Sequence, residues 1–540
     1  MVCRHLRPCR RASRSGEVRR QAGRRGGGLC GSDGHHAFAD EGRTPPVGGG
    51  QHHGVGQREE GGRAGQRIPQ HVQAGPLPGS GRTTGRGIRT PFETHQDPPR
   101  GSPRQARRYR QVGLSGSPRG RQGPRRRIHP AGGEEVKRVI LLALLPVIAA
   151  ADWPQWRGPT ADGVSAETGF PVEWDGVKGT KVRWKVPLPG AGNGSPVVLG
   201  DDVIVTATSG RHHSELHVQC YDRATGKPKW QTDLTATPAD APFSMFPPER
   251  GHAASTPVLT KKAVFALFGT GDLVCLDRAG KPVWMRSLTK EYGIIRNDYG
   301  IAASPVVADG LVLVQVDHLE GSYLLAADAA TGKTKWKTAR TGVYDNWATP
   351  VVVTVGGVKQ IVCLGTKTIA GYDLATGKQA WSLDALERLC SCTPVVRGDK
   401  LFAVSGPSGA NVAIDLAARP SPKVMWQSKK NGPFVPSAVV VDDLYFFTDD
   451  QGTASCLDLK TGAEKWRERI GSGRMRPSPV AAGGHVYFTA LDGTTTVVKA
   501  AAGFEVVAKN PLGEEVAASA SLSRGCVFLR GGKHLWCLGK

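Results

Sequence analysis

The stretch YDRATGKPKW, residues 221–230, recurs through the second half of the chain. Close copies are ADAATGKTKW (327–336), YDLATGKQAW (372–381) and LDLKTGAEKW (457–466), and weaker ones are LDRAGKPVW (276–284), IDLAARPSPKVMW (414–426) and VKAAAGFEVV (498–507). The tryptophans that mark the units lie 40 to 54 residues apart. Self-similarity at such a period is the signature of a repeat architecture.

A second marker, Ser or Thr followed by Pro or Ala, opens a β-rich run ahead of each copy. It occurs at Ser195-Pro196, Thr256-Pro257, Ser304-Pro305, Thr349-Pro350, Thr393-Pro394, Ser437-Ala438, Ser478-Pro479 and Ser519-Ala520. In each unit, short apolar runs are joined by turns in which Gly supplies positive φ and Asp binds turn amides. Eight such units predict an all-β, eight-bladed β-propeller of four-stranded antiparallel blades over residues 176–540.

The two ends of the repeat region predict how the ring closes. HLWCLGK (534–540) is a third strand without a fourth, and VRWKVPL (182–188) is a fourth strand with no unit before it. Pairing them would hide both open edges, so we expect Trp184 in the same sheet as Trp536. The repeat tryptophans should lie on outermost strands and dock on the neighbouring blade, at Trp184, Trp230, Trp284, Trp336, Trp381, Trp426 and Trp466.

The positive charge is concentrated outside the repeats. Residues 1–136 hold 26 Arg, no Lys and 10 Asp plus Glu, a net charge of +16, which leaves +8 of the total +24 for the rest. This distribution argues against a nucleic-acid-binding protein, because the charge is not in the part that can fold. The one long apolar run, VILLALLPVIAAA (139–151), is too short to span a bilayer, so we expect no transmembrane helix in the mature chain.

The first quarter of the chain has the composition of a disordered segment. Residues 1–135 are rich in Arg, Gly and Pro and show no apolar period, so they cannot bury enough surface to fold. They are either a basic arm or sequence upstream of a true start at Val136. Lys137-Arg138, the apolar run and Ala149-Ala150-Ala151 form a signal peptide over residues 136–151. It predicts a periplasmic or secreted protein whose N-terminal extension is 152–175.

Eight cysteines follow Asp152. Four of them, Cys220, Cys275, Cys456 and Cys537, share one repeated position that suits a buried strand, and we interpret them as core thiols. The sequence leaves the disulfide state of all eight open.

The repeated Ala-x-Asp-x-x-Thr-Gly-Lys-x-x-Trp resembles the PQQ repeat of quinoprotein-type propellers, over residues 176–540. DWPQWRGP (152–159) resembles the mature start of exported PQQ-repeat propellers. The resemblance implies one of two roles, because a fold does not fix a function. BamB-like assembly factors are non-catalytic scaffolds, although they carry an acylated Cys that this chain lacks. PQQ-dependent alcohol dehydrogenases need Ca²⁺ ligands, a catalytic Asp and two adjacent Cys, to which Cys390-Ser391-Cys392 comes nearest.

The residues just before each innermost strand of a propeller surround one mouth of its axial channel. Here that binding funnel is polar and aromatic, as ligand and partner sites often are. Its members are Asn193, His252, Arg296, Asn297, Asp298, Tyr299, Asp345, Asn346, Trp347, Arg474 and Arg476, with Arg250, Tyr344, Cys390, Phe434, Glu514 and Glu515 beside them.

Each candidate residue in the funnel has both a functional and a structural interpretation. Asp298 and Asp345 are the candidate catalytic or Ca²⁺-binding groups, although Asn/Asp clusters also make turns. The arginines suit the carboxylates of an anionic cofactor or are solvated rim charges. His212, His213 and His217 have spacing that suits a metal but lack a third ligand nearby, so we expect loop histidines and no metal site.

We therefore interpret the chain as an exported, monomeric PQQ-repeat propeller that acts as a non-catalytic scaffold, with envelope or outer-membrane proteins as partners and no cofactor. One alternative is a quinoprotein oxidoreductase that binds PQQ and Ca²⁺ in the funnel and acts on alcohols or sugars. Another is a protein that binds a polysaccharide or other small molecule without turnover.

Overall fold

The computed structural model describes residues 152–237, 251–297, 299–344, 346–429, 432–471 and 473–539. All of them belong to one compact unit, Glu134–Lys540. The expected disordered region 1–135 and signal peptide 136–151 lie outside the described residues.

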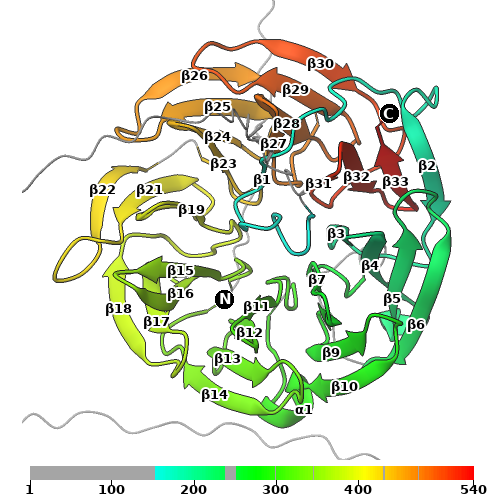
Figure 1. Ribbon diagram of the computed structural model, residues 1–540. Helices are drawn as coiled ribbons and strands as arrows, with labels where there is room; N and C mark the ends of the chain where they lie inside the picture. The colour runs from blue at the N-terminus through cyan, green and yellow to red at the C-terminus, as the bar shows by residue number, and fades with distance from the viewer. Residues whose placement is uncertain are drawn as a thin grey trace, which may run out of the picture. The chain divides into compact units, whose positions relative to one another are not determined.

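The described residues form the predicted eight-bladed propeller, with antiparallel four-stranded blades arranged around one axis (Figure 1). Blades 1 to 4 comprise β3 (Val197–Leu199), β4 (Asp202–Ser209), β5 (Glu215–Asp222) and β6 (Pro228–Thr235); β7 (Val258–Leu259), β8 (Ala263–Leu267), β9 (Asp272–Asp277) and β10 (Pro282–Ser287); β11 (Val306–Ala308), β12 (Leu311–Val316), β13 (Tyr323–Asp328) and β14 (Thr334–Ala339); and β15 (Val351–Val355), β16 (Val358–Leu364), β17 (Thr368–Asp373) and β18 (Gln379–Asp384).

The remaining blades continue the ring. Blades 5 to 8 comprise β19 (Val395–Arg397), β20 (Lys400–Ser405), β21 (Ala410–Asp415) and β22 (Lys423–Ser428); β23 (Val439–Val441), β24 (Leu444–Thr448), β25 (Thr453–Asp458) and β26 (Glu464–Arg469); β27 (Val480–Ala482), β28 (His485–Thr489), β29 (Thr495–Lys499) and β30 (Val506–Asn510); and β31 (Ser521–Ser523), β32 (Cys526–Arg530), β33 (His534–Leu538) and β2 (Val182–Pro187). In the described ranges, two short helices, η1 (Arg211–His213) and α1 (Leu288–Tyr292), lie in loops. No helix among the described residues has the length and apolarity needed to cross a membrane.

The ring closes as predicted. β2 pairs antiparallel with β33, which sets Lys185 opposite Trp536 and Trp184 opposite Cys537. The two ends of the repeat region therefore share blade 8, and neither leaves an open strand edge there. In Figure 1, β2 lies at the outside of the sheet that holds the C-terminus.

The hairpin between the third and fourth strands of blade 1 shows why Asp, Thr and Gly recur in the repeat. The Asp222 carboxylate accepts hydrogen bonds from the main-chain N–H and the hydroxyl of Thr225, at 2.9 and 2.7 Å. Gly226 follows with φ of 72°, and a Cβ there would lie 2.7 Å from the Trp184 ring of the preceding blade. Gly is therefore required both for the positive φ and for the close approach of the indole.

Six repeat tryptophans make the same contact across a blade boundary. In each, the indole Nε1 donates at 2.9 to 3.2 Å to a main-chain carbonyl of the next blade's hairpin: Trp184 to Arg223, Trp230 to Arg278, Trp284 to Ala329, Trp336 to Leu374, Trp426 to Leu459 and Trp466 to Ala501. Trp381 differs, because it donates to Gln360 of its own blade. The next hairpin there carries the insertion AARPSP (417–422) and lacks the Thr-Gly pair.

The N-terminal extension packs on one face of the propeller and hydrogen-bonds to its blades. Trp153 exchanges two main-chain hydrogen bonds with Val198 of blade 1, each 2.8 Å. β1 (Val164–Ser165) then pairs parallel with β27, which adds a fifth strand to blade 7. Figure 1 shows this segment crossing the centre of the ring.

Candidate functional site

A cavity of about 580 Å³ occupies the axis of the propeller and receives residues from all eight blades. We call it the axial cavity. Its lining comprises Trp156, Asn193, Ala254, Tyr299, Ala302, Ser304, Trp347, Thr349, Leu389, Ser391, Thr393, Pro407, Phe434, Val435, Ser437, Arg476, Ser478, Ala517 and Ser519.

Six buried hydroxyls form a ring within this lining. They come from the Ser or Thr marker that opens the innermost strand of each of blades 3 to 8: Ser304, Thr349, Thr393, Ser437, Ser478 and Ser519. Each accepts one N–H hydrogen bond of 2.8 to 3.0 Å, in five cases from the main chain of the preceding blade's marker residue. The repeat sequence thus sets the spacing of this hydroxyl ring around the axis.

Trp156 of the N-terminal extension provides the sixth N–H and forms the floor of the cavity. Its indole Nε1 donates to Thr393 Oγ1 at 2.8 Å. Trp156 and Thr393 line both the axial cavity and a separate cavity of about 220 Å³. The indole therefore stands between two compartments and gives the axial cavity a closed end.

The neighbouring residues of the extension secure that closed end. Leu259 donates its main-chain N–H to Pro154 at 2.7 Å, and the guanidinium of Arg157 donates to the carbonyl of Ala438. Arg157 is buried, and burial lowers its pKa to about 10. We call this end of the channel, covered by residues 153–165, the sealed face.

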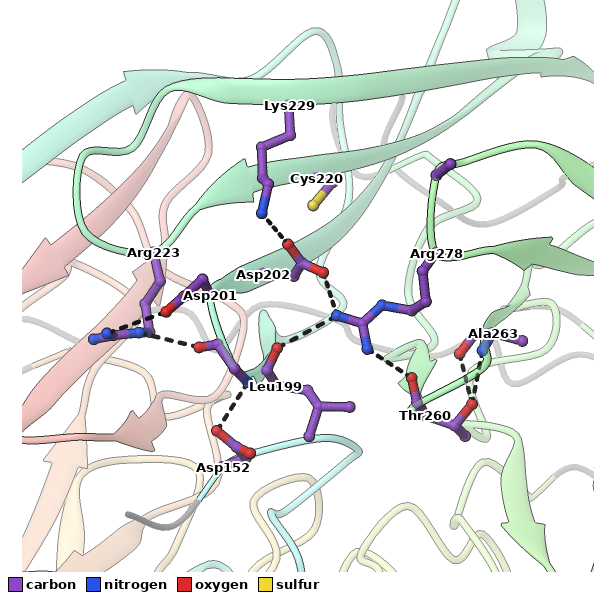
Figure 2. A network of polar contacts seen from close by, with 12 residues as sticks. Asp152, Leu199, Asp201, Asp202, Cys220, Arg223, Lys229, Thr260, Ala263 and Arg278 are labelled. Carbon is purple, nitrogen blue, oxygen red and sulfur yellow. Dashed lines mark hydrogen bonds and ion pairs between the residues drawn. The ribbon is translucent and has the colours of Figure 1, made fainter. Parts of the chain in front are cut away.

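A polar network fixes the start of the extension to the sealed face (Figure 2). Asp152 accepts a hydrogen bond of 3.0 Å from the main-chain N–H of Gly200. Beside it, the Asp202 carboxylate pairs with Lys229 at 2.5 Å and with Arg278. Arg278 also donates to the carbonyl of Thr260 in blade 2, so the network joins blades 1 and 2.

Among the described residues, nothing covers the opposite end of the cavity, which we call the open mouth, and its wall is aromatic. Tyr299 and Trp347 meet edge to face, with ring centroids 5.4 Å apart. Asn297 holds both, because its Oδ1 accepts from the Trp347 indole and from the Tyr299 main chain, each at 3.0 Å. Phe434 lies on the wall contributed by blade 6. Asn297 thus engages the Trp347 indole N–H and the Tyr299 main-chain N–H, and both rings line the cavity.

A buried ion pair supports the loops that carry this wall. Asp317 and Arg340 are almost fully buried, and the guanidinium donates to both carboxylate oxygens at 2.8 and 3.1 Å. Burial opposes the charge, yet the Asp317 carboxylate raises the pKa of Arg340 above its ordinary value. Asn297 donates to the main-chain carbonyl of Asp317 at 3.0 Å, and Asn346 donates to its carboxylate at 3.4 Å.

These loops present an apolar surface beside the mouth. We call it the mouth patch: Ile294, Tyr299, Leu319 and Tyr344, whose exposures are 60, 43, 52 and 48%. Leu319 donates its main-chain N–H to Arg296 at 3.0 Å, so the first two loops are joined directly. Because Tyr299 also lines the axial cavity, the mouth patch is continuous with it.

The structure places the predicted funnel residues at different positions relative to the axial cavity. Asn193, Tyr299, Trp347 and Arg476 line the axial cavity, as does Phe434. His252, Asn297 and Asn346 stand behind the lining, Arg474 is exposed, and Arg296 pairs with Glu320 at the surface at 3.4 Å. Asp298, Asp345 and Arg250 lie outside the described residues.

Two polar members of the funnel are already engaged. Arg476 pairs with Asp450 at 2.8 Å, and the same carboxylate accepts the main-chain N–H of Phe434 at 3.1 Å. Burial lowers the pKa of His252 to about 4, and its Nε2 lies 3.1 Å from the carbonyl of His212. These contacts hold the funnel wall in shape.

Sequence reasoning missed the hydroxyl ring and Trp156. The Ser or Thr of each marker predicts the start of a blade, and its recurrence at one position per blade is the signal that such residues encircle the axis. Trp156 has no such signal, because its place on the axis depends on how the extension folds back over the ring.

The described residues do not fit a calcium-bound quinone. Such a site needs oxygen ligands that include carboxylates. The described lining has hydroxyl, amide, guanidinium and aromatic groups and no carboxylate. Across the described ranges, no group of three or more His, Cys, Asp or Glu side chains is placed to hold a metal.

The cysteines near the cavity do not form a disulfide of the kind that the resemblance to PQQ-dependent alcohol dehydrogenases implies. Cys390 and Cys392 are free and buried, and they pack in different core clusters. The Cys390 thiol donates to the carbonyl of Gly365 at 3.6 Å, and Cys392 donates to Pro436 at 3.2 Å. Burial raises the pKa of Cys390 to about 12 and that of Cys392 well above its ordinary value, so both are inert thiols.

Comparisons with known proteins give the family and leave two functional branches. A family model described as outer membrane protein assembly factor BamB matches residues 164–245, 214–468 and 413–506. The chain is 26% identical over 176 residues to polyvinylalcohol dehydrogenase from Pseudomonas sp, which is 30% of this chain and 25% of that protein. It is also 26% identical over 291 residues to outer membrane protein assembly factor BamB from Burkholderia pseudomallei (strain K96243), which is 51% of this chain and 64% of that protein.

The matches thus span about a quarter and just under two thirds of these two relatives. Among solved structures, quinohemoprotein alcohol dehydrogenase from Comamonas testosteroni superposes with a TM-score of 0.54 at 16% identity, over 72% of this chain and 80% of that one. At that identity the likeness shows a shared fold.

Proposed function

Since the chain belongs to the PQQ-repeat propeller family described as outer membrane protein assembly factor BamB, we propose that it is a non-catalytic, exported scaffold of the cell envelope. Its partners are envelope or outer-membrane proteins, and the mouth patch binds them. Residues 136–151 direct export, 152–175 are the mature N-terminal extension, and 176–540 are the propeller, which acts as a monomer.

The observation that carries this proposal is the mouth patch on its buried support. Exposed contiguous apolar side chains mark interaction sites on soluble proteins. Here the loops that carry them are already held by Asn297, Asn346 and the Asp317–Arg340 pair, so these loops lose little conformational entropy on binding. In the same proposal the repeat tryptophans are structural, because most of them lock one blade to the next.

The test is capture of partners from detergent-solubilised envelope membranes with the immobilised full chain. The double variant Leu319→Ser, Tyr344→Ser removes half of the mouth patch. The matched control Val424→Ser, Met425→Ser changes two exposed apolar residues of β22 on the outer rim. We expect the same envelope protein with the wild type and the control and its loss with the patch variant. Equal capture by all three would contradict the proposal.

The second candidate is a quinoprotein oxidoreductase, favoured by the size of the axial cavity and by the similarity to polyvinylalcohol dehydrogenase. PQQ and Ca²⁺ added to the purified protein decide between the two. Stoichiometric cofactor absorbance together with dye-linked alcohol or sugar oxidation would establish this candidate and overturn the scaffold.

A further inference from the structure

The hydroxyl ring presents hydrogen-bond donors to the axis. Each of its six oxygens accepts an N–H, so each retains its own O–H proton for a further bond. Within the described residues, none of these hydroxyls donates to another protein atom. All six are more than nine-tenths buried and border the axial cavity.

The axial cavity is layered along its length. At the mouth, the wall is apolar and aromatic, with Tyr299, Trp347, Leu389 and Phe434. Deeper in, the hydroxyl ring follows, and the Trp156 indole closes the end. An occupant that enters from the mouth therefore meets apolar surfaces first and converging O–H donors last.

We propose that the axial cavity binds the C-terminal end of a partner polypeptide, with the terminal carboxylate on the hydroxyl ring and the last apolar side chain against Trp347, Leu389 and Phe434. The proposal rests on the scaffold function and names the part of the partner that enters the propeller. The continuity of the mouth patch with the cavity gives the preceding residues of the same segment an apolar surface to follow.

The chemistry of the lining favours a carboxylate over a sugar. A carboxylate on the axis offers acceptor lone pairs in several directions and needs no acceptor in return. Sugar hydroxyls donate as well as accept, and the described lining lacks carboxylates, which are the strongest side-chain acceptors for their protons. The ring donors also act at a buried site, where each hydrogen bond to a charged group is stronger than in water.

The test compares a fluorescein-labelled hexapeptide that ends in leucine with a free carboxylate and the same peptide as the C-terminal amide. Fluorescence anisotropy with the full chain should show at least ten-fold tighter binding of the free acid. Ser437→Ala and Ser478→Ala should each reduce that preference at least three-fold, because each removes one ring donor. Ser195→Ala is the matched control, since Ser195 is a buried marker residue of blade 1 that does not line the cavity.

Equal affinity for acid and amide, no measurable affinity for either, or displacement by a neutral oligosaccharide would each overturn the inference. So would full competition by inorganic phosphate at millimolar concentration, which would indicate a simple anion site. The envelope capture with the Leu319→Ser, Tyr344→Ser variant is scored separately. If capture depends on the patch while acid and amide bind alike, the scaffold function stands and only this inference fails.

Discussion

The innermost strands of the eight blades begin at one end of the axial channel and end at the other, yet the two ends differ in what covers them. On the sealed face, the extension pairs with Val198, places Trp156 under the hydroxyl ring and buries Arg157. At the open mouth, the loops of blades 2 to 4 keep aromatic and aliphatic side chains in solvent over a buried ion pair. The difference shows how a symmetric ring acquires one closed face and one open face, which is the proposed partner surface.

The largest expected effect is on the mouth side, at the buried ion pair. Arg340→Leu leaves the Asp317 carboxylate buried without its partner, which should lower the free energy of unfolding by roughly 3–5 kcal/mol. Arg296→Leu breaks an exposed pair with Glu320 and should cost no more than about 1 kcal/mol. Urea denaturation of both variants measures the contrast, and a similar small cost for each would show that the ion pair does not hold the mouth loops.

Replacing a tryptophan should have different effects on the two faces. Trp153 on the sealed face is 1% exposed, so Trp153→Ala should lower the free energy of unfolding by roughly 3–4 kcal/mol. Trp347→Ala at the mouth changes a partly buried side chain, so it should lower the free energy of unfolding by only about 1 kcal/mol while abolishing capture of the envelope partner. Denaturation and capture are measured on both variants, and a larger loss of stability for Trp347→Ala than for Trp153→Ala would contradict this difference between the faces.

Lowering the pH should destabilise the mouth side before the sealed face. Burial lowers the pKa of His252 from 6.5 to about 4, so the unfolded chain binds more protons between these values. The stabilisation from the neutral imidazole, at most about 3 kcal/mol, is complete above pH 6.5 and is lost as the pH falls toward 4. Arg157 remains charged throughout, because its pKa is about 10.

The pH effect is measured by following the free energy of unfolding from pH 7 to pH 4. His252→Gln should show a smaller loss over this window than the wild type. Parallel curves for the two proteins would show that His252 does not titrate on unfolding in the expected range.

The smallest expected effect is on stability at the mouth patch itself. Leu319→Ser, Tyr344→Ser changes two half-exposed side chains and should alter the free energy of unfolding by less than about 0.5 kcal/mol. A much larger loss would mean that the patch is part of the core and that failure to capture a partner reports misfolding.

The ring could be predicted from the sequence because its determinants are local. The Asp-x-x-Thr-Gly hairpin and the Ser or Thr marker each act within a few residues, and their repetition predicts the blade number. The unpaired strand at each end of the repeat region predicts that Trp184 and Trp536 share a sheet, as they do in β2 and β33. Asn193, Tyr299, Trp347 and Arg476 were found in the same way, since they precede innermost strands.

The rest of the site depends on contacts that no local pattern encodes. Asp317 and Arg340 meet across the strands of blade 3, and their support of Asn346 in the next loop appears only once the blades are assembled. The mouth patch consists of four apolar residues in three loops, without a period. The sealing role of Trp156 arises from a segment that the repeat does not include.

The most direct test of the central claim compares one photo-crosslinkable residue at each end of the channel. The probe replaces Tyr344 in the mouth patch or Val358, which is 49% exposed after the β15–β16 turn at the other end of the innermost strand. Irradiation with envelope membranes should link the Tyr344 probe, and not the Val358 probe, to one envelope protein. Crosslinking from Val358 alone, or equally from both positions, would contradict a partner surface at the open mouth.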